Sequence, residues 1–404
     1  MLWMASASLE HRRFRGATGR VAETQASVLR EILRSSRATE FGRRLGFSSI
    51  RTTRDFQRRV PLSTYDDYRS AVARIADGEP HVLTSERVEL FEPTSGTTGG
   101  EKWIPYTRGL RRQFQAAIRA WIFDLLHERP ALRAGRAYWS VSPAFGETRR
   151  TPGGIPVGFD ADTAYLASFE RRLVGRLLAV PPEVARSRDL DRFRYTTLVW
   201  LLAAEDLALV SVWSPSFLVA LLSRLEEWSG PLCRDLAPRA PKRAEALRRL
   251  LESGASLGEK VARVWPSLRL ISAWTDGAAA QCVPGLRAIF PEVEIQPKGL
   301  VATEGCVSFP LVGGAGAALA LRSHFFEFQD VGGGDCLLAH ELEAGGRYRV
   351  VITTAGGLYR YELRDEVKVI GFDRECPLLR FVGKADRVGD LVGEKLAEGH
   401  VARV

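Results

Sequence analysis

The sequence has few cysteines and no long uninterrupted apolar segment. The longest apolar stretch, 198–213, contains Glu205 and Asp206, whereas a membrane span needs about 20 continuous apolar residues. The N-terminal residues alternate apolar side chains with arginine and do not form a secretory signal. The cysteines are odd in number and form no Cys-x-x-Cys pair, which indicates neither a disulfide framework nor a zinc site: Cys233, Cys282, Cys306, Cys336 and Cys376. We therefore expect a reduced, cytoplasmic protein without a membrane partner.

Positive charge is in excess, but it is not concentrated in one segment. The 404 residues include 57 Lys and Arg against 48 Asp and Glu, a formal net charge of +9. Most of the positive charge is arginine, spread along the chain among acidic residues, and no signature of a nucleic-acid recognition module is present. A basic surface favours anionic substrates such as nucleotides. We expect no nucleic-acid partner.

Hydrophobic periodicity predicts an α/β fold with a β-rich end. Helical patterns dominate the first ninety residues, with segment 63–67 as the cap of a helix through Ile75 and Thr107 as the cap of a long helix reaching residue 127. The middle third mixes predicted helices, including one at 198–208, with short strands. The chain then becomes strand-rich and punctuated by glycine, so we expect layered sheets and helices plus a smaller β-rich subdomain at about 310–380.

One loop between two predicted strands combines residue types that bind phosphate. Strand 88–91 leads into the loop and strand 103–106 follows it. Glycines let backbone N–H groups turn toward one point, hydroxyl groups add donors and a lysine supplies a mobile cation: Thr94, Ser95, Gly96, Thr97, Thr98, Gly99, Gly100 and Lys102. The loop is not a Walker A loop, which would need glycine at 101 and a hydroxyl residue at 103. The pattern predicts a site for the outer phosphates of ATP; the alternative is a flexible Ser/Gly turn.

The loop resembles the phosphate loop of the adenylate-forming superfamily, which includes acyl-CoA synthetases and luciferases. Segment 298–305 resembles the second nucleotide motif of one branch, 359–365 its third, and 381–386 the hinge into a small C-terminal domain. Together with segments 324–328 and 212–215, these are similar to the Gretchen Hagen type of acyl acid amido synthetase, known from plant auxin conjugation and also found in bacteria. The likeness begins near residue 25 and continues to the end, and we expect a bacterial member of this family.

The resemblance implies roles for individual residues. It implies that Lys102 and Glu304 are catalytic and that Glu304 is a Mg²⁺ ligand, because a carboxylate beside a triphosphate needs an intervening cation. The implied ATP-binding residues outside the loop are Thr303, Tyr361, Asp365 and Lys384. Asp365 would accept hydrogen bonds from the ribose hydroxyls. Lys384 occupies the position where the superfamily usually has arginine, and lysine lacks the bidentate guanidinium group of arginine.

One residue of the third motif departs from the family pattern. The residue before Asp365 is usually glycine, and here it is Arg364. If that position requires a left-handed backbone, arginine adopts it at a cost that glycine does not have.

The acid-binding residues are inferred from segments that line the acyl pocket in relatives. Trp213, Phe217 and Trp274 are hypothesised to wall a cavity for a flat or aromatic carboxylic acid. The alternative is that these large side chains belong to the hydrophobic core, in which case truncation lowers stability and leaves the choice of acid unchanged.

The implied reaction is ATP-dependent adenylation of a carboxylic acid to acyl-AMP, followed by transfer of the acyl group to an amine, an amino acid, to form an amide. A coenzyme A ligase of the same superfamily and a non-catalytic nucleotide or acyl-adenylate binding module are the alternatives. We expect residues 1–380 to form the adenylating domain, and residues 381–404 to form the hinge and the start of a C-terminal domain that is otherwise missing. We also expect a monomer that binds nucleotide but forms amide poorly, because such domains close over the site and exclude water.

Overall fold

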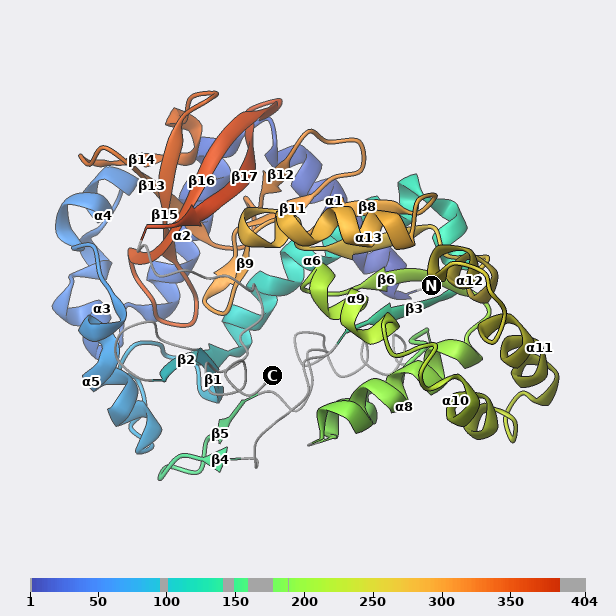
Figure 1. Cartoon of the computed structure of the whole chain (residues 1–404). Coiled ribbons are helices and arrows are strands. Elements are labelled where there is room, and N and C mark those ends of the chain that lie inside the picture. Colours follow the sequence, from blue (N-terminus) through green and yellow to red (C-terminus); the bar gives the residue numbers. More distant parts are fainter. Residues whose placement is uncertain (1, 95–100, 141–148, 159–176, 188, 386–404) are drawn as a thin grey trace.

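The structure is a computed structural model that describes residues 2–94, 101–140, 149–158, 177–187 and 189–385 (Figure 1). The N-terminal part is helical, as its periodicity predicts. Its helices are α1 (Leu2–Ala17), α2 (Val21–Ser36), α3 (Glu40–Arg44), α4 (Thr53–Arg59) and α5 (Tyr65–Ala76), with a 3-10 turn at Phe47–Ser49. The Thr64 side chain and Asp67 form a capping box at the start of α5, so the predicted cap is confirmed.

A small sheet carries both ends of the predicted phosphate loop. Its strand order is β2-β1-β5-β4, and β1 and β2 are antiparallel. The strands are β1 (Val88–Thr94), β2 (Lys102–Thr107), β4 (Arg149–Arg150) and β5 (Pro156–Val157). Helix α6 (Arg108–Glu128) follows β2 directly, and the Thr107 hydroxyl accepts a hydrogen bond from the Leu110 N–H, as the predicted cap requires.

The middle of the chain forms a parallel sheet with the strand order β3-β6-β7-β8. Its strands are β3 (Arg136–Trp139), β6 (Leu207–Ser211), β7 (Leu270–Ala273) and β8 (Glu294–Pro297). Its helices are α8 (Leu190–Ala203), α9 (Pro215–Leu222), α10 (Ser229–Leu236), α11 (Pro241–Leu251), α12 (Leu257–Val264) and α13 (Val283–Ile289). Short 3-10 turns occupy Pro130–Ala134, Pro182–Arg186 and Gly277–Cys282.

The predicted C-terminal boundary of the helix at 198–208 is wrong. Helix α8 stops at Ala203, and β6 takes up the rest of the apolar run from Leu207. All five residues of β6 are buried because the strand lies inside a parallel sheet covered on both faces. A continuously apolar strand has no alternation that distinguishes it from a buried helix.

The C-terminal part forms a seven-stranded antiparallel sheet in the order β11-β12-β17-β16-β15-β13-β14. Its strands are β11 (Ser308–Pro310), β12 (Ala317–Leu319), β13 (Phe325–Asp330), β14 (Cys336–Leu338), β15 (Arg347–Thr353), β16 (Tyr361–Asp373) and β17 (Cys376–Lys384), with a 3-10 turn at Ala339–Glu341. A separate two-stranded ladder, β9 (Val301–Ala302) with β10 (Gly305–Cys306), precedes it.

Most of the buried hydrophobic residues belong to two large clusters. One joins the N-terminal helices to the antiparallel sheet, and the other joins the parallel sheet to helices α8 to α13. Figure 1 shows α8, α10 and α11 on the side of the molecule away from the antiparallel sheet. Helix α6 contributes to both halves, because Phe114 packs in the first cluster while Leu125 packs against Leu209 and Leu270. The mixed α/β architecture with an antiparallel, β-rich part agrees with the predicted fold class. Among the described residues, no helix is long and apolar enough to span a bilayer.

Candidate functional site

The two ends of the predicted phosphate loop lie side by side. Thr94 is the last residue of β1, Lys102 is the first of β2, and the two are register partners. The loop residues between them that carry the predicted phosphate donors, Ser95, Gly96, Thr97, Thr98 and Gly99, lie outside the described residues. The strands therefore place Lys102 directly opposite Thr94.

Two residues at the start of α5 lie beside Lys102 and were missed by the sequence reasoning. The Lys102 ammonium lies 5.8 Å from the ring centroid of Tyr65, and the Tyr65 hydroxyl accepts a hydrogen bond from the Trp103 N–H at 2.8 Å. Arg69 lowers the pKa of Asp66 by hydrogen bonding, and the positive charges of Lys102 and Arg364 add to the effect. In the sequence these residues indicated only a helix cap, and their proximity to the loop depends on how α5 packs against β2.

A tyrosine hydroxyl joins the second motif to the third. Tyr361, the first residue of β16, donates to a carboxylate oxygen of Glu304 at 3.5 Å. Tyr106 on β2 donates to the backbone carbonyl of Thr303 at 2.5 Å. Burial raises the pKa of Tyr361, and the negative charge of Glu304 raises it further, so the phenol remains a donor. The strand that begins with Lys102 and the segments that carry Glu304 and Tyr361 are therefore in direct contact.

A buried histidine supports the turn that carries Glu304. His324 Nε2 accepts a hydrogen bond from the Cys306 N–H at 3.1 Å, and Nδ1 lies 3.0 Å from Gln113 Oε1. This pattern places the proton on Nδ1, and burial lowers the pKa of His324 to about 3, so the ring is neutral. A Cβ at Gly305 would lie 2.8 Å from His324 Nε2, which explains why this position has no side chain.

The predicted ribose-binding residue lies on β16, opposite the hinge strand. Asp365 is buried and is the register partner of Lys384 on β17. Arg364 precedes it with φ 61°, in the left-handed region, and its carbonyl accepts a hydrogen bond from the Ala385 N–H at 2.9 Å. The position therefore has the backbone conformation that the family's glycine favours, and the arginine adopts it.

Replacing Arg364 with glycine should raise the free energy of unfolding by about 0.5–1 kcal/mol, because glycine adopts a left-handed backbone without the steric cost that arginine has there. Urea denaturation would measure the change. Arg374→Gly, at φ 59° in the turn between β16 and β17, is the matched control for a left-handed arginine away from the motif. A loss of stability on Arg364→Gly would show that contacts of the arginine outweigh the backbone cost.

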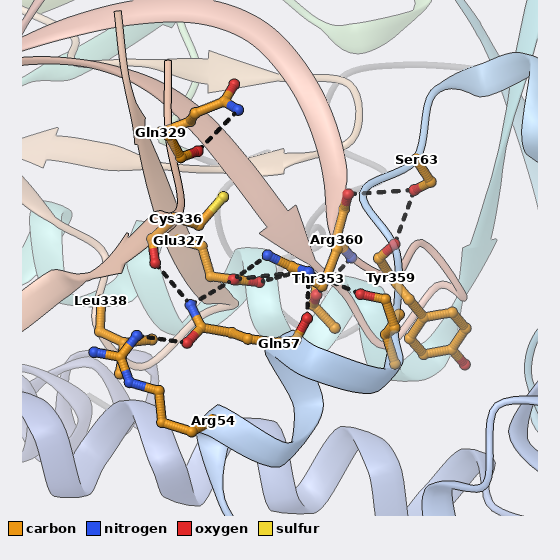
Figure 2. A network of polar contacts seen from close by, with 12 residues as sticks. Arg54, Gln57, Ser63, Glu327, Gln329, Cys336, Leu338, Thr353, Tyr359 and Arg360 are labelled. Carbon is orange, nitrogen blue, oxygen red and sulfur yellow. Dashed lines mark hydrogen bonds and ion pairs between the residues drawn. The ribbon is translucent and has the colours of Figure 1, made fainter. Parts of the chain in front are cut away.

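A buried ion pair fixes the turn that enters β16 (Figure 2). The Arg360 Nε lies 3.1 and 3.0 Å from the two carboxylate oxygens of Glu327 on β13. Its Nη1 donates at 2.8 Å to the carbonyls of Gln57 and Val60, at the end of α4. The Gln57 side chain donates to Glu327 at 2.9 Å, and the Ser63 N–H donates to the Arg360 carbonyl at 3.0 Å. Glu327 is 1% exposed and Arg360 7%, so α4, β13 and the start of β16 meet around a desolvated pair.

The structure brings together two of the three predicted acid-pocket residues. Trp213 follows β6 and Trp274 follows β7, and the Trp274 N–H donates to the Trp213 carbonyl at 2.8 Å. Both therefore lie at the carboxyl ends of adjacent parallel strands, where open α/β sheets bind ligands. Phe217 lies on α9, and its ring contact is with Phe193 of α8, at 6.2 Å between centroids.

The rings near this edge also contact the hinge strand. The Trp274 ring lies 5.3 Å from that of Phe381 on β17, and the Asp276 carboxylate accepts a hydrogen bond from the Phe381 N–H. Two cavities, of about 710 and 430 Å³, lie elsewhere, the first beside Arg136 and Arg243 and the second beside Gln25 and Arg54. The pocket assignment of Trp213, Phe217 and Trp274 stays a prediction.

The donor set around Glu304 fits a magnesium ion only if phosphate supplies the other ligands. No group of three or more His, Cys, Asp or Glu suited to a metal occurs within the described ranges. Magnesium is commonly held by one or two carboxylates together with substrate phosphates. A single half-buried carboxylate at the turn between β9 and β10 meets that requirement.

The fold is that of the adenylate-forming enzymes. The structure superposes on the acyl acid amido synthetase AtGH3.15, solved in complex with 2,4-DB, with a TM-score of 0.82 and 23% identity over 95% of this chain and 71% of that chain. A 2-hydroxyisobutyryl-CoA ligase in the postadenylation state aligns less closely, with a TM-score of 0.50 and 12% identity over 93% of this chain and 67% of that chain.

The sequence comparisons identify the family. The model of the GH3 family N-terminal domain matches residues 10–295, and that of the GH3 family central domain matches residues 317–384. The probable indole-3-acetic acid-amido synthetase GH3.4 of Oryza sativa subsp. japonica is 26% identical over 97% of this chain and 69% of its own length. The indole-3-acetic acid-amido synthetase GH3.3 of Arabidopsis thaliana is 24% identical over 95% and 71%. The chain belongs to the GH3 family, the Gretchen Hagen type of acyl acid amido synthetase, and the resemblance inferred from its motifs is confirmed.

Proposed function

We propose that this protein activates a carboxylic acid with ATP and Mg²⁺ to give acyl-AMP and pyrophosphate, and then transfers the acyl group to the amine of an amino acid. One observation carries the proposal most directly: the Tyr361 hydroxyl contacts Glu304 at 3.5 Å, which joins the second and third nucleotide motifs. Tyr106 connects the same turn to the strand that starts at Lys102. The strand that starts at Lys102 and the segments that carry Glu304 and Tyr361 are therefore in contact, although Lys102 and Tyr361 are 259 positions apart (361 − 102), and this supports a single nucleotide site.

In this proposal the chain's residues act by position and charge. The Lys102 ammonium binds the outer phosphates, and the Asp365 carboxylate accepts the ribose hydroxyls. Glu304, held by the Tyr361 hydroxyl, would ligate Mg²⁺, which neutralises phosphate charge when bound. An oxygen of the substrate carboxylate attacks the α-phosphorus, and pyrophosphate leaves. The protein contributes alignment and charge stabilisation and forms no covalent intermediate.

The acceptor is proposed from the family rather than from a site in this chain. The relatives above are named amido synthetases, which favours an amine over coenzyme A. The coenzyme A ligase superposes with a lower TM-score, and its likeness to this chain is one of fold alone. It therefore does not indicate coenzyme A as the acceptor.

An ATP–pyrophosphate exchange assay tests the proposal. A panel of aromatic and aliphatic acids should give exchange that depends on the acid and disappears with EDTA. Single-turnover trials with an amino acid mixture and with coenzyme A then identify the acceptor. Binding of ATP without exchange for every acid would replace this function with that of a nucleotide-binding module.

A further inference from the structure

A row of buried polar side chains crosses the parallel sheet at its carboxyl edge. Ser211, Ser272 and Gln296 are register partners on β6, β7 and β8, so their side chains lie on the same face. All three are at most 5% exposed. The face is the one covered by α6, because Trp121 Nε1 donates to Gln296 Oε1 at 3.2 Å. Polar side chains are uncommon in the middle of a buried parallel sheet, which is normally apolar on both faces.

A lysine ammonium lies at the end of this row inside a cage of tryptophan rings. Lys298 follows β8 and is 8% exposed, and its Nζ donates to the Ser211 hydroxyl at 2.6 Å. The same atom lies 5.4, 5.3 and 5.5 Å from the ring centroids of Trp121, Trp139 and Trp213. Three aromatic faces stabilise a cation away from bulk water.

Two hydrogen-bond donors of the row are unused. Within the part of the chain that the structure describes, Ser272 Oγ and Gln296 Nε2 are buried and have no hydrogen-bond partner. Buried polar groups are satisfied in the great majority of cases, because an unsatisfied donor loses its hydration without compensation. The Ser272 hydroxyl and the Gln296 amide N–H can both donate, so an oxygen acceptor would complete both groups.

We propose that Ser272, Gln296 and Lys298 bind a second oxygen acceptor on the acid substrate, at the end away from the carboxylate that reacts. The inference rests on the proposed function in one respect, the placement of the acid beside Trp213. The Trp213 ring is half-buried and is one of the three rings around the Lys298 ammonium, so an acid stacked on Trp213 lies beside Lys298. The substrate class is a flat carboxylic acid with a distal carboxylate or hydroxyl. The ammonium favours the carboxylate.

Three matched acids test the site: phenylacetate, 4-hydroxyphenylacetate and 4-carboxyphenylacetate. Calorimetry with the wild-type chain should show tighter binding of the two substituted acids. Ser272→Ala should reduce that preference about tenfold, the usual effect of losing one hydrogen bond in a desolvated site. Its melting temperature should stay equal or rise, because an unsatisfied buried hydroxyl is removed. Lys298→Met should remove the preference for the carboxylate most strongly.

A matched control separates the site from general core effects. Thr197 also has a buried hydroxyl without a partner in the described residues, and it belongs to helix α8 and not to the sheet that carries the row. Thr197→Val should leave the ratio of affinities unchanged. Equal binding of the three acids by wild type, or an unchanged ratio in Ser272→Ala, would overturn the site.

The experiment distinguishes failure of this site from failure of the proposed function. Pyrophosphate exchange without a preference for the substituted acids would reject the site and leave the function intact. A preference that Ser272→Ala removes, without exchange for any acid, would keep the site and reject the function.

Discussion

Glu327→Ala should lower the free energy of unfolding by about 3–5 kcal/mol. Removing one member of a buried ion pair leaves the other charge desolvated and uncompensated. Glu327 is 1% exposed, and its two carboxylate oxygens accept hydrogen bonds from Arg360 and Gln57 (Figure 2). Alanine has no side-chain acceptor for these donors. Urea denaturation monitored by circular dichroism would measure the loss.

An exposed ion pair provides the control for Glu327→Ala. Glu227 pairs with Arg224 in the turn between α9 and α10, with both side chains at least 41% exposed, and Glu227→Ala should change stability by no more than about 0.5 kcal/mol. The double variant Arg360→Met with Glu327→Leu should recover part of the loss, because no charge then remains buried. A loss below about 1 kcal/mol in Glu327→Ala would show that the pair is hydrated or dispensable.

Lys102→Ala and Asp365→Ala should affect two nucleotides differently. Asp365→Ala should weaken ATP and AMP alike, because both carry the ribose that the carboxylate is proposed to bind. Lys102→Ala should weaken ATP far more than AMP, because only ATP presents the outer phosphates. Each charge-assisted contact contributes about 1.5–3 kcal/mol, which corresponds to about 10- to 150-fold in affinity. Calorimetric titration of both nucleotides into each variant would measure the four affinities.

A lysine far from the motifs serves as the control. Lys242 is exposed at the start of α11, and Lys242→Ala should leave both affinities within about twofold of wild type. Equal losses for ATP and AMP on Lys102→Ala would reject the phosphate role of this lysine. Unchanged AMP binding on Asp365→Ala would reject the ribose role of Asp365.

Secondary structure was predictable wherever its signal was local. The caps at Thr64 and Thr107 form because a side-chain oxygen binds an N–H three residues away: the Asp67 carboxylate accepts from the Thr64 N–H, and the Thr107 hydroxyl accepts from the Leu110 N–H, a spacing that the sequence specifies. The boundary between α8 and β6 was not predictable in this way, because the run from residue 198 to 213 is apolar on both sides of Glu205 and Asp206. Only packing in a parallel sheet, covered on both faces, makes its second half a strand.

The candidate site was predictable as a set of motifs but not as a set of neighbours. Tyr361 could be assigned to the third motif, yet its contact with Glu304 joins residues 57 positions apart. Tyr65 was missed because its position beside Lys102 comes from α5 packing against β2. The Lys298 cage assembles rings from α6, the end of β3 and the segment after β6, and none of these gives a local signal.

The sequence by itself determined the family: the order of hydroxyls, glycines and lysine in the predicted phosphate loop, together with the carboxylates of two later motifs, identified the GH3 family. Each of these features is defined by a few adjacent residues, so it can be recognised without knowledge of the fold. The tertiary structure alone decided which side chains meet, including the left-handed backbone at Arg364, the buried pair of Arg360 with Glu327, and the donors at Ser272 and Gln296. Such contacts depend on strand register and on the packing of segments far apart in the chain, and neither is encoded in any short stretch of sequence.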